Sequence, residues 1–483
     1  MAESFLEFDL FINGNWQPAV DGGRIEDYNP ATGELAATVA RAGPEDLNQT
    51  VEAAKCGLAV WRDTHPAERG RILYRIANEI RARSDQLVQL ETLDTGGAIQ
   101  RNKNSVENVC ARRFEYYAGL ADKIMGDTFV APNEYFTYTL REPKGVTAHI
   151  IPWNSPLWIG SRSIAPALAA GNSVIVKPSS EAPLSLLKLA ELASDCGLPP
   201  GVMNVVTGTG SELGEAIARH PEIDAIYFTG SGETAKYVLE HSSRTFMHTV
   251  MELGGKSPNI VMPDADLDSA LTGALWGIFA NSGQICIAGS RLFVHASIHN
   301  SFVERLTEMA RNLRLGGPDT HADLGPMISA RQRESVLSYV ETGREEAHLL
   351  TGGGIPEDPS LRRGYFMQPT IFDFVPAEAT IARDEIFGPV LAVSSFEDID
   401  EVIAMANASN FGLAAAVWTS DLNAAHIIAQ RLESAMVFIN HYFNLGYEVT
   451  RTPYKRSGFG HSEGPQAIDE FLNTKSVSIN MKA

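Results

Sequence analysis

The chain has 483 residues, which is enough for two or three domains with large buried cores. Hydrophobic residues make up 44% of it and charged residues 20%, a balance typical of a folded protein rather than a disordered one. The formal net charge of -20 argues against a general nucleic-acid-binding surface and against binding to anionic membranes. Any anionic ligand therefore needs a local cluster of positive groups.

The cysteines and the N-terminus indicate the compartment. Four cysteines lie far apart, without the CxxC or Cys/His spacings of a zinc site, so neither a disulfide framework nor a metal site is expected. The N-terminal MAESFLEFDLFINGNW has acidic residues where a signal peptide has basic ones. The most apolar segment, residues 164–176, is interrupted by Pro166 and Gly171 and is too short to span a bilayer. We expect a cytoplasmic protein without a membrane span.

The first part of the chain predicts helices followed by a hairpin. Between residues 45 and 123, apolar residues recur at helical spacing, as in RGRILYRIANEIRARSDQLVQLETLDTGG, which ends in a glycine pair. Residues 128–143 (TFVAPNEYFTYTLREP) alternate instead and are rich in Thr, Tyr and Phe. This second pattern predicts an exposed hairpin.

Short apolar runs then alternate with helical stretches. The runs are GVTAHII, NSVIVK, DAIYF and HTVME, and PLSLLKLAELASDCG and ETAKYVLEHSS are helical patterns between them. Such alternation predicts parallel βαβ units. A second series begins near residue 290 with RLFVHA and FVERLTEMARNLRL and runs to about residue 446. The fold class is therefore α/β with two domains of similar size, and the final SVSIN predicts a late strand that joins the 128–143 hairpin.

Polar residues follow four successive predicted strands. GVTAHII leads to Asn154, NSVIVK ends on Lys177, DAIYF leads to a Gly/Ser turn, and HTVME ends on Glu252. Ligands of open parallel sheets bind outside the carboxyl ends of the strands. A lone lysine or glutamate is usually a solvated surface residue, but this shared placement predicts a site at one edge of the sheet.

Two glycine patterns suggest a bound anion. Gly208, Gly210 and Gly214 give GxGxxxG, one residue away from the dinucleotide fingerprint. FTGSGETAK combines a strand, a Gly/Ser turn and a helix start, which would direct backbone N–H groups at an anion such as a pyrophosphate. The alternative for the second pattern is an ordinary helix N-cap by Ser231.

Cys286 lies in FANSGQICIAGSR (residues 279–291), among glycine, serine, asparagine and glutamine. An unpaired cysteine is usually a small buried hydrophobic residue. This polar, glycine-rich setting instead predicts a backbone that lies close to another group and a thiol that can be reached.

Seven motifs now indicate a family resemblance. They are PWN (152–154), KP (177–178), FTGS (228–231), ELGGK (252–256), GQIC (283–286), EIFGP (385–389) and YKRSGFG (454–460). In this order and approximate spacing, from about residue 10 to the C-terminus, they resemble the NAD(P)-dependent, non-acylating members of the aldehyde dehydrogenase superfamily.

The resemblance implies the domain organisation. A Rossmann-like dinucleotide-binding domain would comprise residues 1–122 and 144–253, and an α/β catalytic domain residues 254–464. Residues 123–143 and 465–483 would form a small β oligomerisation extension that completes a neighbouring subunit's sheet. The implied partners are a small aldehyde and further copies of the chain, as a homodimer or homotetramer.

The resemblance also implies residue roles. Cys286 would be the nucleophile, Glu252 the general base and Asn154 an oxyanion donor. The glycine-lined setting of Cys286 would then be the tight approach that a planar ligand needs. Thiolate attack would give a thiohemiacetal, hydride loss a thioester, and hydrolysis assisted by Glu252 the free acid. The implied contacts to NAD or NADP come from Ile151, Trp153, Lys177, Ser180, Gly210, Gly214, Thr229, Gly230, Ser231, Leu253, Glu385 and Phe387.

Three departures from the family pattern refine the expectation. Ser180 stands where NAD-preferring relatives carry a glutamate, so we predict that NADP is usable. Arg162 stands where many relatives have an aromatic residue, and Arg451 aligns with a position that lines the substrate mouth. Two arginines in one pocket would bind a carboxylate, so the predicted substrate is a semialdehyde or another small polar aldehyde. In the late loop, Pro453 and Ser462 replace part of the family motif, which makes its shape the least predictable part.

Alternatives remain open at this stage. Either arginine could point to solvent or pair with a neighbouring acid. An aromatic aldehyde is the main alternative substrate, because Trp158, Tyr442 and Phe443 lie near the expected channel. A coenzyme A-acylating enzyme is a nearer rival than a non-catalytic structural relative, and the presence of Glu252 argues for release of the free acid.

Overall fold

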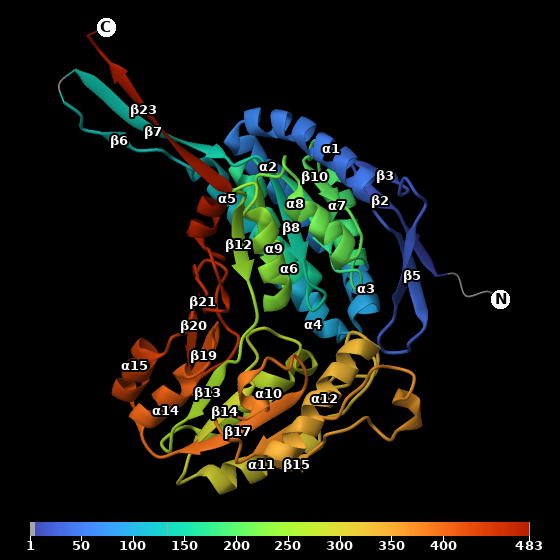
Figure 1. Cartoon of the computed structure of the whole chain (residues 1–483), viewed down its shortest axis with the longest axis vertical. Coiled ribbons are helices and arrows are strands. Elements are labelled where there is room, and N and C mark those ends of the chain that lie inside the picture. Colours follow the sequence, from blue (N-terminus) through green and yellow to red (C-terminus); the bar gives the residue numbers. More distant parts are fainter. Residues whose placement is uncertain (1–4, 133, 483) are drawn as a thin grey trace.

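The computed structural model describes residues 5–132 and 134–482. Two bodies lie one above the other in Figure 1, and a narrow sheet projects from the upper body. The upper body contains an eight-stranded sheet and the lower body a seven-stranded sheet. The predicted α/β class with two βαβ series is confirmed.

The eight-stranded sheet contains the four strands predicted after residue 143. Its order is β22-β12-β11-β8-β9-β10-β2-β3, and the five strands from β12 to β10 are parallel. They are β8 (Val146–Ile151), β9 (Ser173–Pro178), β10 (Met203–Val205), β11 (Ala225–Thr229) and β12 (His248–Glu252). The antiparallel edge strands are β2 (Leu10–Ile12), β3 (Asn15–Gln17) and β22 (Gly458–Phe459). A segment from late in the chain thus closes the edge beside β12.

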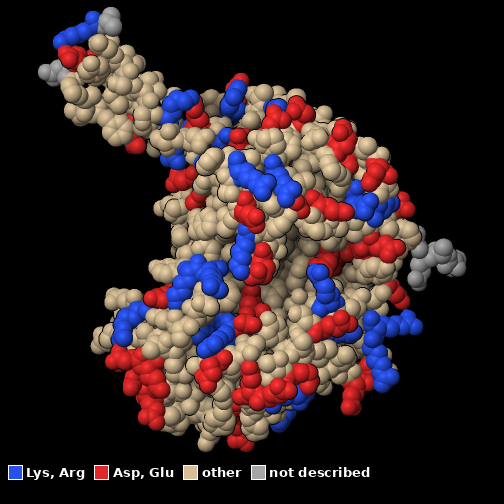
Figure 2. All heavy atoms as spheres, in the orientation of Figure 1, with Lys and Arg blue, Asp and Glu red and all other residues tan. Residues whose placement is uncertain are grey.

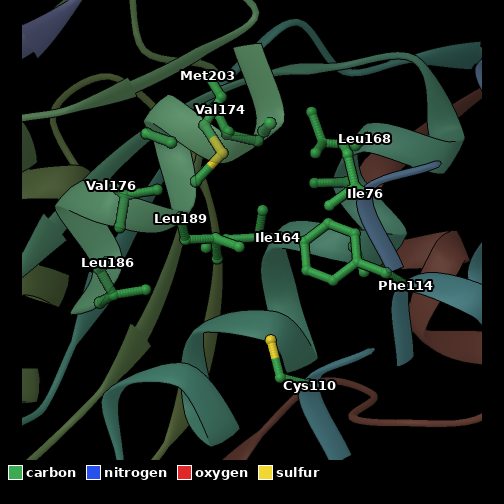
Figure 3. Close-up of a cluster of buried hydrophobic side chains, with 14 of the residues drawn as sticks. Ile76, Cys110, Phe114, Ile164, Leu168, Val174, Val176, Leu186, Leu189 and Met203 are labelled. Atoms are coloured by element: carbon green, nitrogen blue, oxygen red, sulfur yellow. The ribbon is translucent and has the colours of Figure 1, made fainter. Parts of the chain in front are cut away.

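Helices pack on both faces of this sheet, as parallel strands require. Successive residues of β9 alternate between the faces, so Val174 and Val176 belong to one apolar cluster and Ile175 to another. Figure 3 shows part of the first cluster, in which Val174 and Val176 lie near Leu186 and Leu189. The helices are α1 (Pro44–Asp63), α2 (Pro66–Ala82), α3 (Ser84–Thr95), α4 (Ile99–Asn104), α5 (Ala111–Leu120), α6 (Pro156–Ala170), α7 (Leu184–Asp195), α8 (Glu215–Arg219) and α9 (Gly232–Ser242).

One irregularity divides the predicted helical stretch. Between α4 and α5, residues Ser105–Cys110 form a π-helical turn, a feature often found beside functional sites. A second π-helical turn spans Gly210–Gly214, the later part of the GxGxxxG pattern.

The seven-stranded sheet of the lower body has the order β15-β16-β17-β14-β13-β19-β20 and is parallel except for β15. Its strands are β13 (Pro258–Val261), β14 (Arg291–His295), β15 (His348–Thr351), β16 (Thr370–Asp373), β17 (Val390–Phe396), β19 (Ala414–Trp418) and β20 (Met436–Ile439). The helices are α10 (Leu267–Phe279), α11 (His299–Arg311), α12 (Ala330–Glu346), α13 (Thr380–Arg383), α14 (Ile399–Asn407) and α15 (Leu422–Arg431). The second series therefore begins with β13, earlier than expected.

The predicted hairpin and the late strand form the projecting sheet. β6 (Thr128–Phe129) and β23 (Leu472–Asn480) flank β7 (Tyr135–Pro143), and both pairings are antiparallel. Two smaller sheets contain β1 (Leu6–Phe8), β4 (Arg24–Tyr28) and β5 (Leu35–Ala40), and β18 (Phe411–Gly412) with β21 (Tyr454–Lys455). Across residues 5–132 and 134–482, no helix combines the length and apolar character that a bilayer crossing requires.

Candidate active site

A cavity of about 570 Å³ has walls from both bodies. Cys286, Glu252 and Asn154 all line it, so the structure brings these three predicted residues together. Asn154 follows β8, Glu252 ends β12, and Cys286 lies in the loop between α10 and β14. Residues at the carboxyl ends of the parallel strands of the upper body therefore face the same cavity as the Cys286 thiol of the lower body.

Hydrogen bonds fix the orientation of this group. Asn154 Nδ2 donates to the Gln284 carbonyl oxygen at 3.0 Å, which ties the amide to the cysteine loop. The Glu252 side chain is 3% exposed, and its Oε1 has no hydrogen-bond partner within the described part of the chain. Cys286 is half-buried and lines the cavity, so its thiol can be reached, as predicted.

Backbone packing accounts for the glycine beside Cys286. Gly283 has φ 72° and follows two residues that are also left-handed, Asn281 and Ser282. A Cβ on Gly283 would lie 2.0 Å from the Gly388 carbonyl oxygen, so only glycine fits against the EIFGP segment. The backbone near Cys286 does lie close to another group, as the sequence predicts. At Gly283 that group is the backbone of Gly388 and not a planar ligand.

The environment of Cys286 makes its thiol a weaker acid than an ordinary cysteine thiol. Burial raises the pKa of the thiol to about 11, the positive charge of Arg162 opposes this shift, and the carboxylates of Glu252 and Glu385 add to it. At neutral pH the sulfur is therefore mainly a thiol, and its reactive thiolate form increases with pH.

We expect the rate of Cys286 alkylation by iodoacetamide to rise about tenfold for each pH unit below the raised pKa, because only the thiolate reacts. Peptide mapping distinguishes Cys286 from the exposed Cys56. A rate that levels off between pH 7 and 9 would contradict the raised pKa.

Arginines surround the reactive group. Arg162, from α6, lies with Nη1 3.5 Å from Glu252 Oε2, and its Nη2 donates to Thr229 Oγ1 at 3.2 Å. Arg451 Nη2 lies 2.7 Å from Glu463 Oε1. Both predicted substrate-binding arginines line the cavity, and both also pair with an acid, so neither points only to solvent.

These charges shift the pKa values of Arg162 and Glu463. Burial disfavours the charged form of Arg162, but the Glu252 carboxylate and further anionic groups outweigh it, so the pKa of Arg162 is raised. Burial likewise disfavours ionised Glu463, yet Arg113, Arg451 and Arg162 hold the pKa of Glu463 below its ordinary value. Arg162 and Glu463 are therefore both ionised at neutral pH.

Three of the charged residues lining the cavity were missed by the sequence analysis. Arg113 makes a buried ion pair with Glu463, which Arg113 Nε approaches to 3.1 Å. Arg101 and Arg112 also line the cavity. No sequence pattern pointed to this wall of the cavity, because the π-helical turn at Ser105–Cys110 leaves no mark in the apolar periodicity.

The predicted cofactor residues gather along the strand ends of the upper sheet. Ile151 ends β8, Lys177 lies in β9 with Ser180 in the following turn, and Thr229 ends β11. The Gly230 N–H donates to the Glu252 carbonyl oxygen at 3.2 Å, and Ser231 caps α9 by accepting from the Thr234 N–H. Ser231 is therefore a helix N-cap, the alternative named above. The predicted order of strand, turn and helix is also observed, because α9 begins directly after β11 and this turn.

The remaining predicted cofactor residues come from both bodies. Trp153 and Phe387 meet edge to face with ring centroids 5.3 Å apart. The Leu253 N–H donates to the Ser457 carbonyl oxygen at 2.9 Å. A Cβ on Gly214 would lie 3.9 Å from Lys177 Cε, so Gly214 is a neighbour of Lys177, whereas a Cβ on Gly210 would face open space.

Two buried charges mark this region. Lys177 is 4% exposed, its Nζ donates to the Pro178 carbonyl oxygen at 3.1 Å, and burial lowers its pKa to about 8. Glu385 accepts from the Gly255 N–H at 3.0 Å. Burial raises the pKa of Glu385 to about 7, although that hydrogen bond and the Lys256 charge oppose the shift.

Comparison with known proteins identifies the family. The model of the aldehyde dehydrogenase family matches residues 16–477. The chain is 41% identical to a hydroxyisobutyraldehyde dehydrogenase of Mycolicibacterium austroafricanum, with 98% of this chain and 94% of that protein covered. It is 42% identical to a betaine aldehyde dehydrogenase of Rhizobium etli (98% and 97% covered). The chain belongs to the aldehyde dehydrogenase family.

A solved structure agrees with this assignment. The NAD+ complex of an aldehyde dehydrogenase from Bacillus cereus superimposes with a TM-score of 0.96 at 41% identity, covering 98% of this chain and 97% of that one. The predicted aldehyde dehydrogenase-like fold is therefore confirmed, and the chain is an oxidoreductase of the aldehyde dehydrogenase family.

The late loop around Ser462, where the sequence departs from the family motif, lies beside the paired charges of the cavity. Ser462 is buried, with its Oγ 3.2 Å from Tyr227 Oη, and it bridges to Arg451 through backbone hydrogen bonds. The next residue, Glu463, has φ 64° and carries the carboxylate that pairs with the arginines. The departure noted at Ser462 thus coincides with the ionic cluster of the cavity.

Proposed function

We propose that this chain oxidises a small carboxylate-bearing aldehyde, such as a semialdehyde, to the free acid through a covalent intermediate on Cys286. The observation that carries this proposal is the excess of positive charge around the cavity. Among the described residues, five arginines and one acid line the cavity, and Glu463 is paired with Arg451, in a chain whose net charge is -20. An anionic substrate would balance this excess.

Nucleophilic attack is the first step that the proposed geometry supports. The Cys286 thiolate adds to the aldehyde carbon, a C–S bond forms, and the carbonyl oxygen becomes an alkoxide. Asn154 Nδ2 uses one N–H for the Gln284 carbonyl, so its other N–H can stabilise the alkoxide together with the Cys286 backbone N–H.

NAD+, when bound, supplies the acceptor for the hydride that leaves the same carbon. The resulting thioester is hydrolysed by water: a C–O bond forms, the C–S bond breaks, and Glu252 takes the water proton. Burial of Glu252 in the cavity wall beside Cys286 supports this role. The carboxylic acid then leaves, and coenzyme A is not needed as an acceptor.

The residues at the strand ends fit a dinucleotide. The N-terminus of α9 follows Gly230 and Ser231, and a Cβ on Gly232 would meet open space, so backbone N–H groups there can approach a pyrophosphate. The buried Lys177 ammonium and Glu385 carboxylate suit the adjoining phosphate and ribose hydroxyl groups.

We predict that Arg162→Leu raises KM for a semialdehyde by about 10- to 100-fold, because a hydrogen bond to a charged group contributes about 1.5–3 kcal/mol. KM for propanal, which has no carboxylate, should change far less. Steady-state kinetics with both substrates measures this. An unchanged KM for the semialdehyde would overturn the substrate class.

An aromatic aldehyde is the second candidate substrate. Trp158, Tyr442 and Phe443 all line the cavity, as do Phe438 and Tyr447, and these rings could accept a planar apolar group. A screen of semialdehydes against aromatic and aliphatic aldehydes, with kcat/KM measured for each, separates the two candidates.

We predict that NADP+ is accepted alongside NAD+, because the Ser180 hydroxyl and Lys177 can receive a ribose 2′-phosphate that a glutamate would repel. Ser180→Glu should lower kcat/KM with NADP+ by roughly tenfold or more and leave NAD+ use intact. Comparison of kcat/KM for the two cofactors is the measurement. A strong NAD+ preference of the unaltered chain would indicate that the neighbouring Glu181 has taken over the discrimination.

We also propose the domain division and assembly implied by the family resemblance. Residues 1–122 and 144–253 would bind the dinucleotide, residues 254–464 would carry the catalytic cysteine, and residues 123–143 and 465–483 would mediate a homodimer or homotetramer. Phe129, Phe136 and Ile479 are exposed on the projecting sheet, which is largely uncharged in Figure 2, and this supports the last part. The four scattered free cysteines favour a cytoplasmic location.

A further inference from the structure

Arg162 spans the ends of two neighbouring strands. Thr229 and Glu252 are paired in the register of β11 and β12, and the Arg162 guanidinium contacts both side chains. Nη2 donates to Thr229 Oγ1 at 3.2 Å, and Nη1 lies 3.5 Å from Glu252 Oε2. The residue proposed to bind the substrate carboxylate therefore already holds the residue proposed to activate water.

The contact between Arg162 and Glu252 is incomplete on both sides. Arg162 Nε and Glu252 Oε1 are buried atoms without a hydrogen-bond partner in the described part of the chain. The 3.5 Å separation is also longer than that of a strong charge-assisted hydrogen bond. A guanidinium has five N–H donors in a planar fork. Arg162 can therefore donate hydrogen bonds to a second carboxylate without moving its own side chain.

We propose that Arg162 restrains Glu252 until an anionic group of the substrate binds the guanidinium, and that this exchange releases Glu252 to activate water. Arg162 is thus a positioning residue as well as a binding residue. The inference rests on the proposed substrate class, because an aldehyde without a carboxylate leaves the restraint in place.

The exchange affects one step of the reaction. During thioester hydrolysis, water oxygen bonds to the carbonyl carbon, the Cys286 sulfur leaves, and the water proton passes to a Glu252 oxygen. The contact with Arg162 keeps the Glu252 carboxylate from turning toward the attacking water. General-base catalysis needs a hydrogen bond between the base and that water, so release of Glu252 accelerates hydrolysis of the thioester.

Other charged and titratable groups around this pair come from several elements. Tyr227 of β11, Cys286, Glu463, Arg113 and Arg451 all act on Arg162 or on the cluster that contains it. Within residues 5–132 and 134–482, the carboxylate that pairs with Arg162 is Glu252, whereas Arg451 pairs with Glu463. Arg451 therefore offers a matched control, an arginine of the same cavity that does not contact Glu252.

The test isolates the hydrolysis step. 4-Nitrophenyl acetate acylates the Cys286 thiol without hydride transfer: a C–S bond forms, the ester C–O bond breaks and 4-nitrophenolate leaves. The acetyl group leaves most of the cavity for a second small molecule. Hydrolysis of this acetyl-enzyme is measured at pH 8 with increasing formate, at ionic strength held constant with chloride. We expect formate to accelerate hydrolysis by about threefold or more in the unaltered protein. An unchanged or lower rate would overturn the proposal, even if no variant folds.

Two variants complete the test. In Arg162→Met, hydrolysis of the acetyl-enzyme should be faster than in the unaltered protein without formate, and formate should have no effect. In Arg451→Met, acceleration by formate should persist. If Arg162→Met still responds to formate, or if Arg451→Met no longer does, the restraint does not act through Arg162.

The outcome also separates this inference from the proposed function. If formate competes with a semialdehyde in steady state but leaves hydrolysis unchanged, the substrate class stands and the restraint is wrong. If formate does neither, and semialdehydes are not preferred over propanal, both are wrong.

Discussion

Cys286→Ala should lower kcat for aldehyde oxidation by roughly 10⁴-fold or more, because the remaining groups cannot form the covalent intermediate. The cavity would retain Asn154 and Glu252, so aldehyde binding should persist. Production of reduced cofactor, followed by absorbance after rapid mixing, measures the loss, and the initial burst should disappear with it.

The other cysteines provide the control. Cys56 is exposed on α1, and Cys110 is buried near Phe114 in the core shown in Figure 3, so neither reaches the cavity. Cys56→Ser should therefore retain full activity. Substantial activity in Cys286→Ala, or its loss in Cys56→Ser, would refute the assignment of the nucleophile.

Glu252→Gln should lower kcat by about 10²- to 10⁴-fold while the first turnover continues, because the base is needed for hydrolysis and not for attack. The acyl-enzyme should then accumulate. Mass spectrometry of the intact protein should detect the added mass, and peptide mapping should locate it on Cys286. A glutamine keeps the size of the side chain but leaves the Arg162 charge without its partner.

The order of events distinguishes this outcome from general damage. A normal burst of reduced cofactor followed by slow turnover fits loss of the hydrolytic base. If Glu252→Gln instead abolishes the burst, Glu252 acts earlier than proposed, or loss of the ion pair has distorted the cavity. Binding of NAD+ to the variant, measured by quenching of tryptophan fluorescence, separates these two explanations.

The residues that could be predicted from sequence lie where secondary structure directs them. Asn154, Lys177 and Glu252 follow or end apolar runs that form parallel strands, so local patterns were enough to bring them to one edge of the sheet. The strands β10 and β2 escaped prediction because three-residue strands carry too little periodicity.

The ionic cluster could not be predicted in the same way. Arg113 and Glu463 are 350 positions apart, and no local pattern connects a helix of the upper body to a loop near the C-terminus. Arg162 and Arg451 were found only through their positions relative to family motifs. Their pairing with Glu252 and Glu463 depends on the path of the late loop, where Glu463 adopts a left-handed conformation that sequence patterns seldom reveal.

The pairing of β22 with β12 has a consequence for biosynthesis. Met251 and Glu252 find their backbone partners in Phe459 and Gly458, which are synthesised long after β12. Until then the growing polypeptide holds an open sheet edge, which invites association with other nascent chains. A premature stop before Gly458 should therefore yield aggregates rather than a weakly active fragment.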